Sequence, residues 1–505
     1  MTTAPLSAYA TSSFKSHSLL PILTIITSMV SAILAFPVAK LIDAFGRAEG
    51  FAFVALCSTL GSILSVACTG IDSYFGARVF KTIGNTGSDY VATVIISDMT
   101  ALISRPFYLG LTALPYLATG FAGPAIADRL LQVSSWRWGY GIFSITTPVV
   151  SSFLLYFLFV KQREAQKFQV AAESPVPKGI KKQALYWFWE FDVIGLTLVA
   201  AGFVLLLLAV TLAKYNGSTW RSGHIIAMLV LGPVFILAFL LWERSALNPK
   251  PMIPFHLLRD RTVLGVCLMG AVTRIAFYLW ANYFPSYLQV VHGLSVTRAS
   301  YVDNVYSYVT CAWAPLLGLL FRHCCPYPKR VALAAIPVHL AGAAMLIAFR
   351  ARASPLAGVV ASQALLALGG GTLTNAEEIA IMAAAGEHQN VAVVLAFKAF
   401  FAYLGGAVGS AVSGAVWTNL LPRYLEEYLP GTEKAQAKKI FASLKTQLSY
   451  AWGSPERTAI VKAYMDVQKV QTVAATVVVA VSTVFVLMWR DLSLKERVQT
   501  KGRVL

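Results

Sequence analysis

Residues 192–214 have the sequence DVIGLTLVAAGFVLLLLAVTLAK, in which no charged residue occurs between Asp192 and Lys214. A helix of this length rises about 35 Å, which is enough to cross the roughly 30 Å of hydrocarbon in a bilayer. The whole chain has a similar character, because 57% of its 505 residues are apolar, 13% are charged and its mean hydropathy is +0.65. In a typical soluble chain, roughly a quarter of the residues are charged. The composition therefore excludes a soluble enzyme or a disordered protein and indicates a membrane protein.

Apolar runs of this length recur along the chain between short polar turns. They predict an all-α polytopic membrane protein with about thirteen transmembrane helices. The expected spans cover residues 19–39, 51–70, 74–97, 108–128, 136–160, 192–214, 223–243, 262–290, 299–321, 331–350, 355–379, 390–416 and 470–489.

The distribution of Lys and Arg predicts the orientation of these spans. The chain has a formal net charge of +18. Its basic residues gather in every second connection and in the tail after residue 489, as is typical of cytoplasmic segments. We therefore expect the C-terminus inside the cell and the N-terminus outside. The positive charge fits loops beside anionic lipid, so the expected partner of this surface is the lipid bilayer and not a nucleic acid.

The spans and loops divide the chain into successive segments. We expect an N-terminal bundle of five spans, a basic cytoplasmic linker, two linking spans, a cytoplasmic loop, a C-terminal bundle and a cytoplasmic tail. They cover residues 1–160, 161–191, 192–243, 244–261, 262–489 and 490–505. Within the C-terminal bundle, residues 417–469 form an extracellular amphipathic segment, which we interpret either as a surface cover or as a gate.

Prolines predict two helix starts in this extracellular segment. Pro422 should open a short helix that ends near Pro430. Ser454, Pro455 and Glu456 have the order of an N-cap, a first-turn proline and an acidic first-turn residue, so a second helix should begin there and run into the last span.

Ionisable side chains inside the bilayer are costly unless they face a partner or a water-filled cavity, so they mark functional sites. The span 74–97 contains Arg78, Lys81, Asn85 and Asp89 at intervals of three or four residues, which places them on one helical face. This polar stripe should face a cavity or another helix. Asp89 is therefore a candidate for a role in transport, and a structural ion pair is the alternative.

The second half of the chain offers counterparts for these charges. Arg274 lies roughly 18 Å into the span 262–290, near the middle of the bilayer, where it could pair with Asp89 or with an anionic substrate. Lys398 lies about 12 Å from the inner face and should pair with Glu378. We expect that pair to be structural, because a lysine near the interface can extend to the headgroups.

Glycines cluster in two of the predicted spans. Gly369, Gly370 and Gly371 should interrupt the span 355–379 near its middle, which would suit a flexible binding site, with close helix packing as the alternative. Gly405, Gly409 and Gly414 are expected to allow close packing of helices.

Other chemistries find little support in the sequence. The six Cys residues predict no disulfide framework, and the seven His residues form no cluster with Cys or carboxylates, so we expect neither a metal site nor an enzyme. No phosphate-binding loop is visible, which argues against ATP as the energy source. Asn216 begins an Asn-Gly-Ser sequon on the predicted outer face and is a candidate glycosylation site.

A short motif on the predicted inner face carries a family resemblance. Residues 39–49 have the sequence AKLIDAFGRAE, and the placement of Asp43, Gly46 and Arg47 resembles the cytoplasmic motif of the major facilitator superfamily. In that superfamily the acidic and basic residues pair with neighbouring helices. Alanine occupies three further motif positions, and the order Gly-Arg-Ala-Glu is similar to that of fungal siderophore-iron transporters.

The resemblance covers nearly the whole chain. It includes ISDMT at 96–100 followed by Arg105, SWRWGYG at 135–141, RTV at 261–263, YFPSYLQVV at 283–291, GSAVSGAVW at 409–417 and GSPER at 453–457. The chain is thereby identified as a member of the fungal siderophore-iron transporters. This implies the major facilitator fold, two helical bundles around a central cavity, and a cytoplasmic gate motif formed by Asp43, Gly46, Arg47, Asp98 and Arg105.

The same resemblance implies a function. It is the proton-driven import of ferric hydroxamate siderophores, in which iron is carried only as the ferric siderophore and no cofactor is needed. We expect a monomer in the plasma membrane, with endosomal vesicles as the alternative location.

One feature departs from the family. Its members resemble 14-span facilitators with both ends in the cytoplasm, whereas this sequence predicts an odd number of spans. Residues 7–20 look like the loop that follows a first helix, so a helix that normally lines the central cavity is expected to be missing. A truncated gene model and a protein that works in reduced form both fit this pattern.

Two other functions compete with siderophore import. The first is export or exchange of another organic solute, such as a secondary metabolite, a drug or glutathione. Gly120, Gly123 and Pro124 resemble part of an antiporter signature of the superfamily, although its spacing and terminal Gly pair are missing. The second is a non-transporting sensor with a transporter fold.

Overall fold

The computed structural model describes residues 20–166, 179–213, 219–245, 247–250, 255–350, 355–386, 390–431 and 433–496, together with Thr3, Leu6, Ser7 and Ala10. This described part is helical and contains no strand. Twelve of its helical segments are long and apolar enough to span a membrane. α4 (Ile71–Met99) has 29 residues and is also long enough, but it is more polar. The predicted all-α polytopic membrane protein with about thirteen spans is confirmed.

The helices are grouped by the segments of the chain in which they lie. The N-terminal bundle contains α2 (Leu20–Phe45), α3 (Arg47–Ala67), α4, α5 (Arg105–Ala113), α6 (Pro115–Val133) and α7 (Trp136–Gln166). The linking region contains α8 (Ile180–Glu190), α9 (Val193–Leu212) and α10 (Gly223–Arg244). The C-terminal bundle contains α11 (Phe255–Leu258), α12 (Arg261–Ala281), α13 (Phe284–His292), α14 (Val296–Asp303), α15 (Val305–His323), α16 (Pro328–Arg350), α17 (Leu356–Ala384), α18 (Val391–Tyr428), η3 (Lys434–Gln436), α19 (Ala437–Ala442), α20 (Leu444–Ser449) and α21 (Pro455–Leu487).

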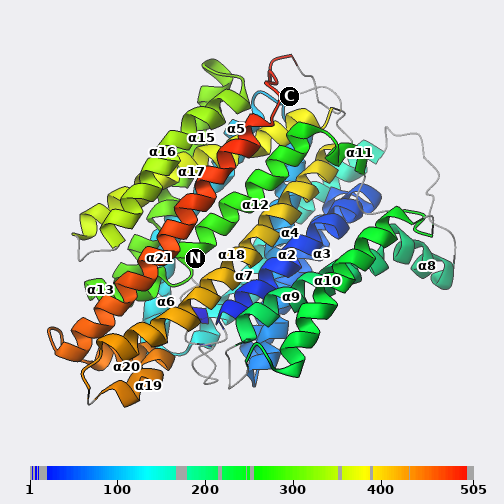
Figure 1. Cartoon of the computed structure of the whole chain (residues 1–505). Helices are drawn as coiled ribbons and strands as arrows, with labels where there is room; N and C mark the ends of the chain where they lie inside the picture. The colour runs from blue at the N-terminus through cyan, green and yellow to red at the C-terminus, as the bar shows by residue number, and fades with distance from the viewer. Residues whose placement is uncertain are drawn as a thin grey trace.

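The two most extensive contacts between the bundles are each made by one helix pair. α2 packs along α18, and α5 packs along α15. Figure 1 shows α12 and α18 in the middle of the molecule, between α2 to α4 on one side and α16, α17 and α21 on the other. α9 contacts both α2 and α18, so the linking helices lie beside one of the two junctions.

Aromatic rings fill the junction of α2 and α18. The ring of Phe36 lies 5.6 Å, centroid to centroid, from the rings of both Phe397 and Phe400. Tyr90 of α4 donates a hydrogen bond of 2.5 Å to the carbonyl oxygen of Ala392. Helices of the first and second halves of the chain are thus in direct contact at this level.

Glycines set the spacing of α12 and α18. A Cβ atom at Gly405 would lie 2.2 Å from the carbonyl oxygen of Ala271, and one at Gly409 would lie 2.7 Å from that of Ile275. Real Cβ atoms do not approach other atoms so closely, so these positions require glycine. The packing role expected for Gly405 and Gly409 agrees with this contact.

Three predicted spans are each divided into two helices. Pro115 starts α6 and Pro285 lies in the first turn of α13, where a residue without an N–H group interrupts no helical hydrogen bond. The third break, at Asn304, separates α14 from α15.

Two predictions about helix ends were wrong. α17 is continuous across Gly369, Gly370 and Gly371, so these residues do not interrupt the span. α18 runs through Pro422 to Tyr428, so this proline does not open a separate helix. At the three glycines the neighbouring helices pack closely against α17, and this tertiary packing outweighs the local preference for a break.

The segment predicted to be extracellular packs onto the C-terminal bundle. As predicted, Ser454 caps α21, and its Oγ accepts a hydrogen bond of 3.1 Å from the backbone N–H of Arg457. The guanidinium of Arg457 donates to the carbonyl oxygens of Gln447 and Val290. Residues of α13, α20 and α21 are thereby held together.

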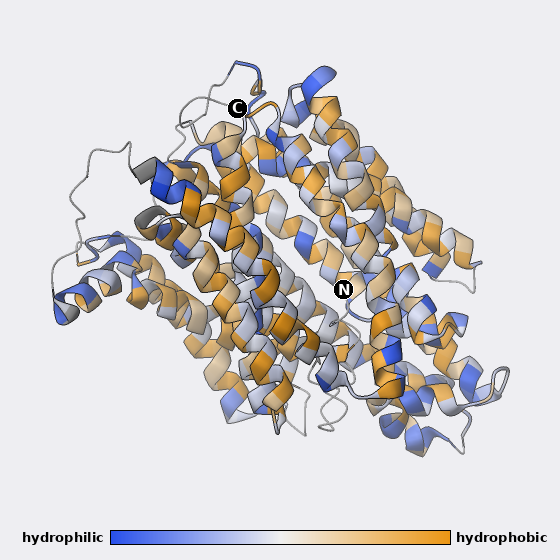
Figure 2. Cartoon of the chain, turned by 180° about the vertical axis from the view of Figure 1, so that it is seen from behind, coloured by the Kyte–Doolittle hydropathy of each residue, from blue (hydrophilic) through white to orange (hydrophobic). Residues whose placement is uncertain are grey.

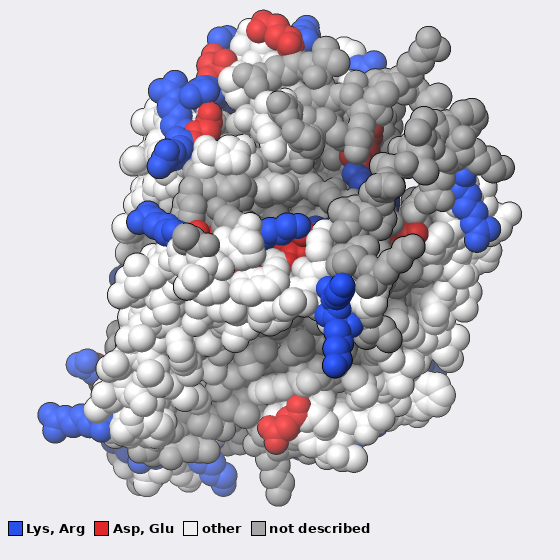
Figure 3. All heavy atoms as spheres, turned by 90° about the vertical axis from the view of Figure 1, so that its right-hand side faces the viewer, with Lys and Arg blue, Asp and Glu red and all other residues white. Residues whose placement is uncertain are grey.

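The surface is consistent with a molecule that spans a bilayer. Hydrophilic residues gather toward the two ends of the helices, and hydrophobic residues predominate between them (Figure 2). On the face shown in Figure 3, Lys and Arg side chains lie in the upper part, toward the end that carries the C-terminus in Figure 1, and also at the lower end. The orientation in the membrane stays a prediction from the sequence.

The orientation can be tested with epitope tags. A tag inserted after Gly431, between α18 and η3, should bind antibody on intact cells, whereas a tag after Leu505 should bind only after permeabilisation. The reverse pattern would contradict the assigned orientation.

The α12–α18 contact can be tested by substitution. Gly405→Ala should lower stability by about 1–3 kcal/mol, because the added methyl group overlaps the backbone of α12. The measurement is the Tm of the purified protein in detergent. Gly76→Ala in α4 is the matched control, because a Cβ atom there has no neighbour within 4 Å. Equal Tm values for the two variants would contradict the packing role.

Candidate functional site

Five charged side chains from both bundles meet at one cavity. This cavity, which we name the inner cavity, has a volume of about 200 Å³ and is bounded by α2, α4, α12, α17 and α18. Its charged lining residues are Asp89, Arg274, Glu377, Glu378 and Lys398. Four of these five were predicted from the sequence, so the structure brings together residues that are up to 309 positions apart (398 − 89).

A second cavity lies within the C-terminal bundle. This bundle cavity has a volume of about 340 Å³ and is bounded mainly by α12, α15, α16, α17 and α21. Its lining combines aromatic rings with hydroxyl groups and one histidine, namely Phe277, Trp280, Tyr306, Thr310, His339 and Thr374, among others. Arg274 and Glu377 line both cavities, and they therefore lie where the two cavities meet.

The polar stripe of α4 divides into two parts. Lys81 is buried within the N-terminal bundle, where its Nζ lies 3.3 Å from Ser62 Oγ and 4.9 Å from the centre of the Tyr140 ring. Asn85 accepts a hydrogen bond of 3.1 Å from Ser58, while Arg78 has a buried Nε without a partner. Only Asp89 reaches the inner cavity. Lys81 and Asn85 therefore hold α4 against its neighbours in the N-terminal bundle.

Arg274 projects into both cavities without an ion pair. It lies in the middle of α12, and no carboxylate oxygen of the described residues is within 4.0 Å of its guanidinium. Asp89 faces the same inner cavity from the opposite bundle. Arg274 and Asp89 thus line the same cavity but form no direct ion pair. The N–H groups of the guanidinium remain available to another hydrogen-bond acceptor.

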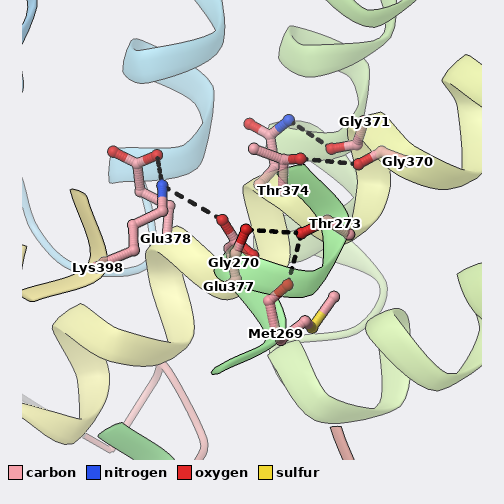
Figure 4. Close-up of polar contacts among 10 residues, drawn as sticks. Met269, Gly270, Thr273, Gly370, Gly371, Thr374, Glu377, Glu378 and Lys398 are labelled. Carbon is pink, nitrogen blue, oxygen red and sulfur yellow. Dashed lines mark hydrogen bonds and ion pairs between the residues drawn. The ribbon is translucent and has the colours of Figure 1, made fainter. Parts of the chain in front are cut away.

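Lys398 lies between two adjacent glutamates. Its Nζ is 2.7 Å from Glu378 Oε2 and 3.6 Å from Glu377 Oε1 (Figure 4). The predicted pair of Lys398 with Glu378 is confirmed. The lysine side chain is only 13% exposed, so it does not extend to the membrane surface as a lysine near the interface would.

Glu377 was not predicted from the sequence as a site residue. The pair Glu377–Glu378 in an otherwise apolar stretch is a usable signal, but neighbouring residues on a helix point about 100° apart, and only Glu378 was expected to pair with Lys398. His339 was not predicted either, and it contacts the Leu366 carbonyl oxygen at 3.1 Å in the wall of the bundle cavity.

A buried arginine near the outer end of the bundle was also missed. Arg350 is fully buried, and its guanidinium lies over the rings of Trp280 and Phe284, 4.5 Å and 3.7 Å from their centres. Its Nη1 donates to Gln468. The sequence places Arg350 at a span end, which gives no sign that this end is covered by α13 and α21.

The triple glycine serves close packing. A Cβ atom at Gly369 would lie 2.4 Å from the backbone nitrogen of His339, and one at Gly370 would lie 2.4 Å from the hydroxyl of Tyr306. These glycines let α17 approach α16 and α15 beside the bundle cavity. The packing alternative therefore accounts for them.

The cytoplasmic motif forms the expected link between helices. Arg47 Nε donates to Asp98 Oδ2 at 2.8 Å and joins the start of α3 to the end of α4. Gly46 has a φ of 112°, which other residues rarely adopt. Arg105 is fully buried, and its Nε donates to the Thr100 carbonyl oxygen at 3.1 Å. The side chain of Asp43 and the whole of Asn216 lie outside the described residues.

These features together define a multi-pass integral membrane protein with a charged cavity between two helical bundles. The sequence model of the Major Facilitator Superfamily matches residues 1–410. The chain belongs to this superfamily and, within it, to the siderophore iron transporter family.

Curated relatives support the assignment to the siderophore iron transporter family. The chain is 37% identical to "MFS siderochrome iron transporter 1" of Ajellomyces capsulatus over 98% of this chain and 84% of the relative. It is 38% identical to "MFS siderochrome iron transporter D" of Aspergillus fumigatus, over 99% and 83%. It is 36% identical to "Siderophore iron transporter 1" of Schizosaccharomyces pombe, over 93% and 76%.

Solved structures support the fold. The human organic anion transporter MFSD10 aligns over 94% of this chain and 89% of its own, with a TM-score of 0.53 and 10% identity. The proton:xylose symporter XylE aligns over 94% and 90%, with a TM-score of 0.52 and 13% identity. At these identities the comparison concerns the fold alone.

Proposed function

We propose that this protein imports ferric hydroxamate siderophores by proton symport. It acts as a monomer in the plasma membrane and supplies iron to the cell. The observation that carries the proposal is the inner cavity, in which α2 and α4 of one bundle face α12, α17 and α18 of the other. A cavity between two bundles can be opened to one side of the membrane at a time when the bundles tilt. The names of the curated relatives supply the substrate class.

Arg274 and the aromatic rings suit a ferric hydroxamate. The hydroxamate and carbonyl oxygens of such a chelate accept hydrogen bonds, and the Arg274 guanidinium has donors free for them at the meeting point of the cavities. Phe277, Trp280 and Tyr306 offer apolar faces to the organic part of the ligand. Iron enters this scheme as cargo within the chelate.

Asp89 suits a role in proton coupling. Among the described residues it is the acidic group that the N-terminal bundle contributes to the inner cavity. A carboxylate kept inside a membrane without an ion pair is costly, so its presence favours a function such as proton exchange. Arg274 on the opposite bundle would approach or leave Asp89 as the bundles move.

The substrate and the driving force can be tested together. Cells of a yeast strain without its own siderophore carriers should accumulate radioiron from ferric hydroxamates when they express this protein. A protonophore should abolish the accumulation. Uptake that persists under the protonophore, or export of another solute without any siderophore uptake, would overturn the proposal.

Asp89→Asn tests the coupling role. The substitution keeps shape and polarity but removes the titrating group, so we expect normal surface expression, retained counterflow and no accumulation driven by a pH gradient. The three quantities should be measured on the same cells.

A purely structural Asp89 predicts a different pattern. In that case Asp89→Asn should lower the amount of protein at the surface, and a second substitution of the cation in the same cavity, Arg274→Gln, should restore it. Full accumulation by Asp89→Asn would contradict both roles.

A further inference from the structure

Glu377 and Glu378 are adjacent in sequence but lie in different environments. Glu378 has its Oε2 2.7 Å from Lys398 Nζ, and its side chain is 24% exposed. The Glu377 side chain is 4% exposed, and its Oε1 lies 3.6 Å from the same Nζ. The second oxygen of Glu377, Oε2, is buried and has no hydrogen-bond partner. One glutamate is thus neutralised, while the other is buried and incompletely paired.

The local charges do not balance when both glutamates are ionised. Among the described residues, Lys398 is the one cation within 4.0 Å of either carboxylate. One positive charge can neutralise one carboxylate, and burial of a second negative charge with an unpartnered oxygen costs free energy. A proton on Glu377 removes that charge and turns the carboxylate into a neutral hydrogen-bond donor. The geometry therefore favours a proton at this position while Lys398 stays with Glu378.

Glu377 lies between a cavity that extends outward and one that extends inward. With the C-terminus inside, α16 reaches the outer face at Arg350, and the bundle cavity follows it from His339 to Leu346. α18 starts at the inner face at Val391, and the inner cavity follows it from Leu395 to Tyr403. Glu377 lines both cavities.

Other polar groups surround this position. The charged and titratable groups that line the two cavities or act on Glu377 are Asp89 and Tyr90 of α4, Tyr116 of α6, Cys267 and Arg274 of α12, Tyr306 and Cys311 of α15, His339 of α16, Glu378 of α17 itself, and Lys398 and Tyr403 of α18. The described lining residues of α2 and α21 carry no such group. Lys398 is the cation nearest to Glu377, and Arg274 lines the same two cavities.

We propose that Glu377 is the group that binds the transported proton from the outer side and releases it toward the inner side. The O–H bond of the neutral carboxylic acid breaks, the proton leaves through the inner cavity, and the carboxylate that remains shares Lys398 with Glu378. Asp89 faces only the inner cavity, so it follows Glu377 on the inward path. This inference rests on the proposed proton symport.

Glu377→Gln separates a proton-binding role from a structural one. If Glu377 only neutralised Lys398, its loss would be tolerated, because Glu378 already lies 2.7 Å from the lysine. A proton-binding role instead predicts normal surface level and counterflow, with loss of accumulation driven by a pH gradient. Accumulation equal to that of the wild type would overturn the inference.

The matched control is Glu164→Gln, which removes an acidic side chain from an exposed ion pair with Lys161, outside the lining of both cavities. Gradient-driven accumulation should persist in this variant. An equal loss in Glu164→Gln and Glu377→Gln would show that the effect does not depend on the position of Glu377 and would overturn the inference.

A measurement on the unmodified protein covers the case in which variants fail to fold. Dicyclohexylcarbodiimide reacts with protonated carboxyl groups in apolar surroundings, and mass spectrometry locates the adduct. At neutral pH the label should appear on Glu377 and be absent from Glu378. The reverse distribution would overturn the inference.

Failure of the inference can be told apart from failure of the proposed function. If the wild-type protein accumulates siderophore without need of a pH gradient, the proton symport is wrong and the assignment of Glu377 falls with it. If the wild type depends on the gradient and Glu377→Gln does so equally, only the assignment of Glu377 is wrong.

Discussion

The scarcity of counter-charges inside the membrane governs the centre of this protein. A buried charge in a bilayer needs a partner or water, and here two cations and three acids share one small cavity. Lys398 can satisfy one glutamate fully, and Arg274 has no carboxylate within ion-pair distance. Several charges of the site therefore have no fixed partner, and binding of a proton or a substrate can change the net charge of the cavity. A cluster in which every charge had a partner would not respond in this way.

Close helix packing makes this arrangement possible. The charged residues come from α4, α12, α17 and α18, and they meet only because those helices approach at small residues. Gly405 brings α18 against the backbone of α12, and Gly369 does the same for α17 against α16. The aromatic contact of Phe36 with Phe397 then joins the first bundle to the second at the level of the inner cavity. The glycines allow the close helix packing that brings these charged residues together, although the two sets are far apart in sequence.

The sequence predicts the periodic and pairwise features well. The spans, the exposure of Asp89 to a cavity and the pair of Lys398 with Glu378 all follow from helical spacing and from the cost of charges in lipid. Features that depend on a neighbouring helix do not follow. Nothing local indicates that Lys81 turns into the N-terminal bundle, that α18 continues through Pro422, or that Glu377 is buried while Glu378 is not. Those outcomes depend on which face of a helix meets its neighbour, and a single sequence does not contain that information.

The division of charges between the bundles links movement to protonation. Asp89 belongs to the N-terminal bundle, whereas Arg274, Glu377, Glu378 and Lys398 belong to the C-terminal bundle. In the proposed symport, a tilt of the bundles about the α2–α18 and α5–α15 contacts would leave the distances within the second group nearly constant but would change the distance from Asp89 to that group. The electrostatic field at Asp89 would then depend on the conformation, while the pair of Lys398 with Glu378 would not. Under this proposal the proton affinity at the bundle interface depends on the access state, as coupling requires.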